Sequence, residues 1–168
     1  FELNIIGEYY LRFADKVVQQ LCADNWGDGV GLTESKIATI TSIGVVFEGN
    51  TRVTSFNELQ YFTSLIYVDA RAFRNCTNLH IVTLPEQVDR IGADSFRGSG
   101  IKSINLGNIT ILETYAFANC KNLEVVDIPN LRFWGIDDTS ISQFGGSGIK
   151  RIVNLGKVTT IPNHFASH

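Results

Sequence analysis

Two serines in glycine-rich segments are the first residues of this sequence that could do chemistry. Ser99 lies in Gly98-Ser99-Gly100, and Ser147 lies in Gly145-Gly146-Ser147-Gly148. A nucleophilic serine on a sharp strand-to-helix turn needs a glycine both two residues before it and two residues after it. Isoleucine stands at the later position in both segments. We therefore interpret both segments as turns, and we expect that the chain is not an enzyme.

A glycine-rich loop near the N-terminus is the next candidate, for a nucleotide or for a metal ion. Residues 27–31 read Gly-Asp-Gly-Val-Gly, but Leu32 stands where a dinucleotide-binding loop needs its third glycine. A calcium loop needs oxygen ligands at alternate positions and a closing glutamate. Gly27 and Gly29 take ligand positions, and Lys36 takes the place of the glutamate. We expect a structural loop without cofactor or metal.

The histidines and cysteines stand apart from other potential ligands. The histidines are His80, His164 and His168, and none has a second ligand at helical or strand spacing. The cysteines are Cys22, Cys76 and Cys120, and they form no CxxC pair. We expect isolated surface imidazoles, free thiols and no metal site.

Composition limits the possible partners. The 168 residues carry 14 Lys and Arg against 17 Asp and Glu, with no block of like charges, which disfavours nucleic acid as a partner. The hydrophobic content of 44% suffices for a continuous core, yet no apolar run approaches the roughly 18 residues of a membrane span. The chain opens at Phe1 without a signal-peptide pattern, so we expect a mature or excised piece of a longer protein.

A repeat positions these residues. Phenylalanine recurs at Phe73, Phe96, Phe117, Phe144 and Phe165, with periods of 23, 21, 27 and 21 residues. Within each unit a Leu or Ile follows the phenylalanine, and a branched apolar residue comes three positions later. This spacing predicts short parallel strands, which we expect to be centred on Val82, Ile104, Val126 and Ile152.

Each predicted strand ends in Pro or Gly, and a second apolar pair follows, such as Val88 and Ile91. We expect these pairs to pack the opposite wall of each coil. Leu155 comes three residues after Ile152, where the other strands have two, so the last strand should contain a bulge. Five residues inserted within residues 136–143 should protrude from one face.

The segment upstream of Phe73 predicts an incomplete start of the repeat. Residues 59–73 carry Leu65 and Val68 in strand register but lack a second wall, and residues 43–56 form a still more degenerate unit. Further upstream, Phe13, Val17 and Leu21 share one helical face, which predicts a helix over residues 13–21 that covers the first coil.

The repeat motif resembles a known family. Ala-Phe-x-Asn-Cys-x-x-Leu occurs at residues 72–79 and 116–123, and Val-x-x-Ile-Gly-x-x-x-Phe occurs at residues 88–96. With strands that end in Leu-Pro or Ile-Pro, these motifs resemble the BspA-like, Treponema pallidum-type leucine-rich repeats over about residues 59–165. The N-terminal part is similar to the segment that precedes such repeats in Bacteroides proteins. The resemblance implies an extracellular or cell-surface protein with an adhesion or protein-binding role.

We therefore expect an α/β leucine-rich-repeat solenoid, right-handed, with short parallel strands on one face, an irregular second wall and a helical N-terminal cap. Residues 1–42 form the cap with its glycine-rich loop, and residues 43–168 form about five repeats, the last one truncated. Cys76 and Cys120 then lie two coils, or about 10 Å, apart. This distance exceeds the reach of a disulfide.

The outward positions of the predicted strands form a candidate partner surface. One column contains Tyr67, Ile81, Ser103, Val125 and Arg151, and the next contains Asp69, Thr83, Asn105, Asp127 and Val153. An aromatic with branched residues and arginine is typical of protein-binding patches, so we expect a protein or glycan partner on a host or neighbouring cell. The alternative is that these residues are ordinary strand formers, and that the chain is a structural spacer without a ligand.

The C-terminal edge is a second candidate surface. Val158, Ile161 and Phe165 would be left partly uncovered, because no capping sequence follows them. We expect that the natural protein continues beyond this edge, or that the edge mediates self-association.

Overall fold

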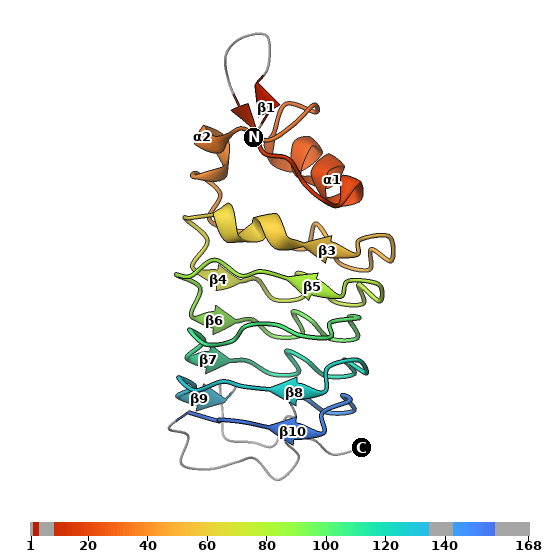
Figure 1. The fold of residues 1–168 in the computed structure, drawn as a ribbon, viewed down its shortest axis with the longest axis vertical. Helices are drawn as coiled ribbons and strands as arrows, with labels where there is room; N and C mark the ends of the chain where they lie inside the picture. Colours follow the sequence, from red (N-terminus) through yellow and green to blue (C-terminus); the bar gives the residue numbers. More distant parts are fainter. Residues whose placement is uncertain (1, 4–8, 135–142, 157–168) are drawn as a thin grey trace.

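The computed structural model describes residues 2–3, 9–134 and 143–156, and these residues form successive coils stacked along the long axis of the molecule (Figure 1). In chain order the elements are β1 (Glu2–Leu3), β2 (Tyr9–Tyr10), α1 (Lys16–Trp26), α2 (Glu34–Ile37), β3 (Ser55–Phe56), the 3-10 helix η1 (Asn57–Tyr61), β4 (Tyr67–Val68), β5 (Ile81–Val82), β6 (Arg90–Ile91), β7 (Ile111–Leu112), β8 (Val125–Val126), β9 (Phe133–Trp134) and β10 (Arg151–Ile152). Except for Gln143, the insertion predicted within residues 136–143 lies outside the described residues. So do Val158, Ile161 and Phe165 of the predicted open edge, and His164 and His168.

Short parallel strands form two walls on opposite sides of the coils (Figure 1). In the first wall β3 pairs with β5, β8 pairs with β10, and an isolated parallel bridge joins Ile81 to Ser103. In the second wall the order is β4-β6-β7-β9, and Tyr67, Arg90, Ile111 and Phe133 lie side by side. The parallel strands predicted at Val82, Val126 and Ile152 are confirmed.

The strand predicted around Ile104 is reduced to the bridge at Ser103. Asn105 Oδ1 accepts a hydrogen bond from Gly107 N at 2.9 Å, which closes a tight turn directly after Ile104. The backbone therefore leaves the wall before a regular strand can form. Leu106 still points into the core and is buried.

The bulge predicted in the last strand is confirmed by its hydrogen bonds. Val153 N donates to Val126 O at 2.8 Å, whereas Ile128 N donates to Asn154 O at 3.0 Å. A regular parallel ladder would bring Ile128 N to Val153 O instead. The pairing thus shifts by one residue between the two bonds, as a bulge requires.

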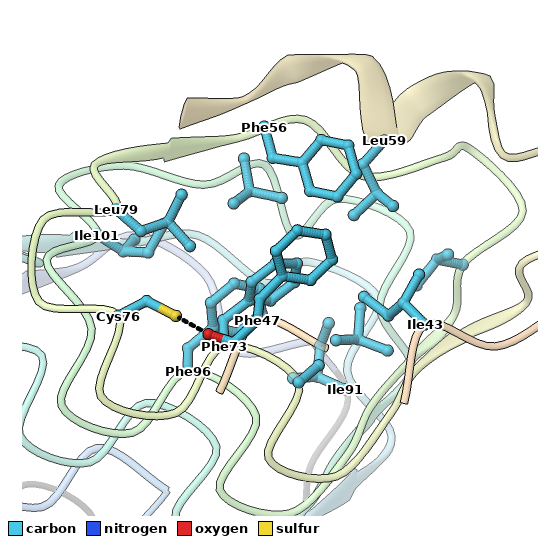
Figure 2. Packing of buried hydrophobic residues seen from close by; sticks show 14 of the residues in the cluster. Ile43, Phe47, Phe56, Leu59, Phe73, Cys76, Leu79, Ile91, Phe96 and Ile101 are labelled. Atoms are coloured by element: carbon cyan, nitrogen blue, oxygen red, sulfur yellow. Dashed lines mark hydrogen bonds between the residues drawn. The ribbon is translucent and has the colours of Figure 1, made fainter. Parts of the chain in front are cut away.

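A column of phenylalanine rings forms the centre of the core. Phe47, Phe73, Phe96, Phe117 and Phe144 are fully buried, one in each coil, and successive ring centroids lie 5.4, 5.1, 5.0 and 5.6 Å apart. Figure 2 shows the first three of these rings one behind another. Their spacing is close to the separation of about 4.8 Å between neighbouring strands. The ring column and the strand ladders therefore share one repeat distance.

The first coil starts at Phe47, so the prediction of a shortened repeat over residues 59–73 is wrong. Phe56 pairs with Val82 in the first wall, and Val68 pairs with Ile91 in the second wall. Residues 47–72 therefore form one complete coil with both walls. In this coil η1 occupies the position at which the later coils turn at Pro or Gly.

The helix predicted over residues 13–21 is displaced toward the C-terminus. Asp15 is the N-cap of α1, because its carboxylate accepts hydrogen bonds from Val17 N at 2.8 Å and from Val18 N at 3.3 Å. The same carboxylate accepts a hydrogen bond from Thr54 N at 2.7 Å. The start of α1 is thus fixed to the first coil.

The buried face of α1 also differs from the predicted one. Val18, Cys22 and Ala23 are its buried residues, whereas Val17 and Leu21 are half-buried. Phe13 precedes the helix and is buried against Phe56, with ring centroids 6.1 Å apart. α1 lies at the N-terminal end of the stack, above the first coil (Figure 1).

Candidate functional site

Most of the residues predicted to form a partner surface lie together on the outer face of the first wall. They are Ile81, Thr83, Ser103, Asn105, Val125, Asp127, Arg151 and Val153, which we name the first-wall surface. Ile81 is 48% exposed and Val125 is 44% exposed, although both belong to strands. Branched apolar side chains thus stand on a solvent-facing sheet. Thr83 is half-buried, and the other members are exposed.

The prediction that Tyr67 and Asp69 share this surface is wrong. Tyr67 pairs with Arg90 and therefore lies on the second wall. The Asp69 carboxylate accepts hydrogen bonds from Ile43 N at 2.8 Å and from Gly44 N at 2.9 Å. It thereby holds the segment that leads into the first coil, which is a structural role. The error follows from the wall assignment, because the outward positions of β4 belong to the opposite face.

Cross-coil hydrogen bonds hold two side chains of the first-wall surface, Thr83 and Asp127, and an ion pair lies beside them. Thr83 Oγ1 donates to Asn57 Oδ1 at 3.1 Å, and Asn154 Nδ2 donates to Asp127 Oδ1 at 2.8 Å. Next to them, Lys150 Nζ lies 2.6 Å from Glu124 Oε1. Such an exposed ion pair contributes little stability, but it neutralises both charges.

Two exposed cations on this face have no ion-pair partner among the described residues. They are Arg151 of the first-wall surface and Lys102, which lies next to Ser103. The face therefore combines apolar Ile81 and Val125 with unneutralised positive charge. This combination is typical of the centre and rim of a protein-binding patch.

The second wall carries apolar exposure that the sequence did not predict. Phe133 of β9 is 61% exposed. Tyr67 of β4 and Ile66, which directly precedes β4, are also exposed. Between β4 and β9, the Arg90 guanidinium donates to the buried Glu113 carboxylate. The negative charge of Asp69 raises the pKa of Tyr67, so its hydroxyl stays protonated. Phe133 could have been predicted, because it aligns in the repeat with Arg90, which directly precedes the inward Ile91, and neighbouring strand residues point to opposite faces.

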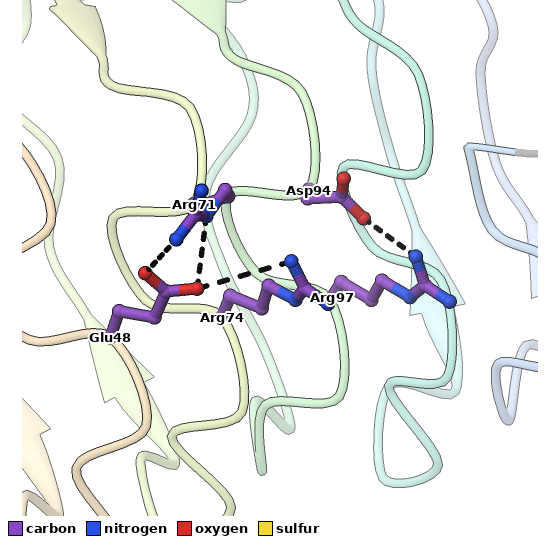
Figure 3. Close-up of polar contacts among 5 residues, drawn as sticks. All are labelled: Glu48, Arg71, Arg74, Asp94 and Arg97. Atoms are coloured by element: carbon purple, nitrogen blue, oxygen red, sulfur yellow. Dashed lines mark hydrogen bonds and ion pairs between the residues drawn. The ribbon is translucent and has the colours of Figure 1, made fainter.

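The third side of the coils is a seam of paired charges (Figure 3). Arg71 makes two hydrogen bonds to Glu48, at 3.0 and 2.6 Å, and Arg74 lies 3.9 Å from the same carboxylate. Arg97 pairs with Asp94 at 3.0 Å. The hydrogen bond from Arg71 lowers the pKa of Glu48. These charges satisfy one another between and within coils, which indicates a structural role for this side.

The glycine-serine segments follow a turn that every coil repeats. In the five coils whose phenylalanine the structure describes, the residue two positions after it has positive φ, at Gly49, Asn75, Gly98, Asn119 and Gly146. Only glycine and asparagine occur there, since this conformation disfavours other side chains. The glycines beside Ser99 and Ser147 thus serve the backbone, and Ser99 is itself buried. The interpretation of both segments as turns is confirmed.

Cys76 and Cys120 lie at the same turn and join neighbouring coils. Cys76 Sγ donates to Phe47 O (Figure 2), and Cys120 Sγ donates to Phe96 O, both at 2.9 Å. All three cysteines of the chain are free and buried. Burial raises the pKa of Cys76 and of Cys120 to about 11, so both thiols remain protonated and unreactive at neutral pH.

His80 also joins two coils, so its prediction as an isolated surface imidazole is wrong. Its Nδ1 lies 3.1 Å from Gly100 O. Because a carbonyl oxygen only accepts, Nδ1 carries the proton. Across the part of the chain that the structure describes, no three His, Cys, Asp or Glu side chains come together as a metal site would require.

Comparison with known families identifies the repeat. The profile of the BspA type leucine rich repeat region matches residues 46–167 in six copies. The chain belongs to the BspA-type leucine-rich repeat family. The resemblance inferred from the sequence is confirmed, and the match begins next to Phe47, where the first coil starts. Searches of curated proteins and of solved structures found no match.

BspA-type leucine-rich repeats are generally non-enzymatic binding modules of surface-associated proteins. The two walls supply the short parallel strands of this repeat, grouped in small sheets. Within the described residues, no helix is long and apolar enough to cross a membrane.

Proposed function

We propose that this BspA-type chain is an extracellular solenoid that binds a protein through its first-wall surface, while α1 serves as a cap for the first coil. One observation carries the proposal. Ile81, Val125 and Val153 are branched apolar residues that remain about half exposed along one sheet face. The solvent-facing side of a sheet normally carries polar residues. Exposed apolar residues grouped on one such face therefore mark an interaction site.

The backbone under this surface supports binding without rearrangement. Parallel pairing fixes the positions of Ile81 and Val125, and cross-coil bonds from Thr83 and Asn154 hold their neighbours. A surface that is already ordered loses little conformational entropy when a partner binds. Lys102 and Arg151, which form no ion pair with another described residue, favour a partner with carboxylates around an apolar centre.

The proposed cap rests on contacts between α1 and the first coil. Val18 and Cys22 are buried in the core cluster, and Trp26 packs against Phe47 and Phe62. Without α1, apolar residues of the first coil such as Phe47 and Phe62 would be exposed to water. A terminal element of a repeat array must prevent this exposure.

A binding screen with matched variants tests the function. The purified chain is presented to arrays of extracellular proteins and glycans, and the affinity for each ligand found is then measured for Ile81→Thr/Val125→Thr. Both substitutions keep β-branching but remove apolar area, so we expect the affinity to fall at least about tenfold at a central patch.

The control is Ile66→Thr, which makes the same change on the second wall and should leave the affinity within about twofold. Loss of binding in the control but not in the double variant would place the site on the second wall. If the chain binds no protein or glycan on the arrays, the binding proposal is contradicted, and a structural spacer that holds another domain is favoured.

A further inference from the structure

The loop between α1 and α2 borders an open hollow at the N-terminal end of the molecule. Trp26, Gly27, Asp28, Gly31, Thr33 and Lys36 line it, and its volume is about 200 Å³. Pockets for drug-sized ligands usually measure about 300–1,000 Å³. The hollow therefore fits one small ring better than a peptide segment. It does not share a residue with the first-wall surface.

The loop around the hollow is held by contacts with a distant part of the chain. The Tyr10 hydroxyl donates to Asp28 Oδ2 at 2.5 Å, while Asp28 Oδ1 accepts from Val30 N and Gly31 N, both at 2.9 Å. The ring of Tyr10 occupies the space that a Cβ of Gly31 would need, with Cδ1 only 2.5 Å from that position. The lack of a side chain at Gly31 thus lets the Tyr10 ring pack directly against the loop. This contact fixes the shape of the hollow before a ligand binds.

Trp26 brings an aromatic surface and a free donor to the hollow. Its ring packs against Phe47 and Phe62, with centroids 6.3 Å apart in both pairs, so the indole is held by the core. No hydrogen bond to its indole N–H is found among the described residues, and the nitrogen is not one of the buried unsatisfied atoms. The indole N–H is therefore open to solvent, and it can donate to an acceptor on a ligand.

The charges of the hollow are balanced. The hydrogen bond from Tyr10 lowers the pKa of Asp28 to about 2, so this carboxylate is ionised at neutral pH. Lys36 supplies one positive charge, and it has no ion-pair partner within the described ranges. One charge of each sign favours neither an anion nor a cation. A neutral ligand with several hydroxyl groups can use both, as donor to Asp28 and as acceptor from Lys36.

We propose that this hollow binds a single neutral sugar ring, such as the terminal hexose of a glycan. The apolar face of the ring packs against the indole of Trp26, and its hydroxyls contact Asp28 and Lys36. The site is separate from the first-wall surface and does not depend on the protein-binding function proposed for it.

Nuclear magnetic resonance of the indole N–H groups tests the proposal. The chain has two tryptophans, and loss of one indole signal in Trp26→Phe identifies that of Trp26. The methyl glycosides of glucose, galactose and N-acetylglucosamine are the probes. We expect at least one of them to shift the Trp26 signal saturably below about 100 mM, the weak range of a single small ring. The Trp134 signal should not move.

Two variants distinguish a site from a nonspecific effect. Lys36→Gln removes the positive charge and should weaken binding at least about tenfold, whereas Lys102→Gln makes the same change on the first wall and should leave binding unchanged. Unfolding by urea checks that both variants remain folded. Glucuronate and glucosamine carry a net charge and should bind at least about threefold more weakly than the neutral ring.

Several results would overturn the proposal. They are the absence of a saturable shift with all three glycosides, equal binding by Lys36→Gln and the parent chain, and tighter binding of a charged sugar or of a capped dipeptide. The variant Ile81→Thr/Val125→Thr keeps the hollow, so it should bind the sugar normally. Sugar binding by this variant therefore tests the hollow independently of protein binding at the first-wall surface.

Discussion

Replacement of Phe96 measures how much the stacked rings contribute to stability. This ring lies 5.1 Å from Phe73 and 5.0 Å from Phe117, with interplanar angles of 21° and 2°, and it is fully buried. An aromatic pair contributes about 0.5–1.5 kcal/mol beyond the burial of area. Phe96→Leu keeps most of the apolar volume but removes both pairs, so we expect a loss of about 1–3 kcal/mol. Phe96→Ala also leaves a cavity, which raises the expected loss to about 3–5 kcal/mol.

Urea unfolding followed by circular dichroism gives the free energy of unfolding for each variant, provided that the slope of the transition is unchanged. Phe133→Leu is the matched control, because it makes the same change at a side chain that is 61% exposed. It should cost less than about 0.5 kcal/mol. If Phe96→Leu costs no more than this control, the ring column does not hold the coils together and the reasoning is wrong.

Three further predictions concern single residues. Leu123→Ala should cost about 2–5 kcal/mol in urea unfolding, because Leu123 is 1% exposed, and a loss below about 0.5 kcal/mol would contradict the assigned register. Burial raises the pKa of Asp15, but hydrogen bonds from Thr54 and from the first turn of α1 outweigh it, so the pKa lies below its ordinary value. The stabilisation by this carboxylate is therefore present above the ordinary pKa and is lost as the pH falls below it. Asp15→Ala should cost about 0.5–2 kcal/mol at neutral pH, and the difference from the parent chain should shrink in acid unfolding experiments; a constant difference would refute this account. Tyr10→Phe should raise the pKa of Asp28 from about 2 toward its ordinary value, as measured by carbon-detected titration, and an unchanged pKa would show that the hydroxyl is not the cause.

The repeat spacing is sufficient to predict the two walls and the core. A phenylalanine in each unit, followed by pairs of apolar residues three positions apart, can be buried only if successive coils stack. The bulge near Val153 is predictable for the same reason, because Leu155 must still reach the core after one extra residue. Local periodicity carries these features, and no distant contact is needed to find them.

The wall assignment of residues 65–68 shows where spacing alone fails. Leu65 and Val68 are three positions apart, like the pairs of both walls, so the pattern does not distinguish the walls. The distance to the next phenylalanine does: Val68 lies five residues before Phe73, as Ile91 lies five residues before Phe96. This distance assigns Tyr67 to the second wall.

Contacts between distant segments account for the remaining errors. The start of α1 depends on Thr54, which shares the capping carboxylate of Asp15, although an Asp before an apolar helical segment is itself a known start signal. The hollow beside Trp26 depends on the ring of Tyr10, which fills the space at Gly31. The residue types at positions 25–36 predict a structural loop in place of a calcium site, but they do not indicate which distant residue packs against it.

The phenylalanine column has a consequence for how such a chain can change over generations. Each coil returns to the same buried ring position, whatever the number of residues that it used on the way. An insertion or deletion in one turn is therefore absorbed before the next ring, as the unequal periods between Phe47 and Phe144 illustrate. Mutations that alter length remain local, so natural selection can vary a single loop while the rest of the molecule keeps its shape.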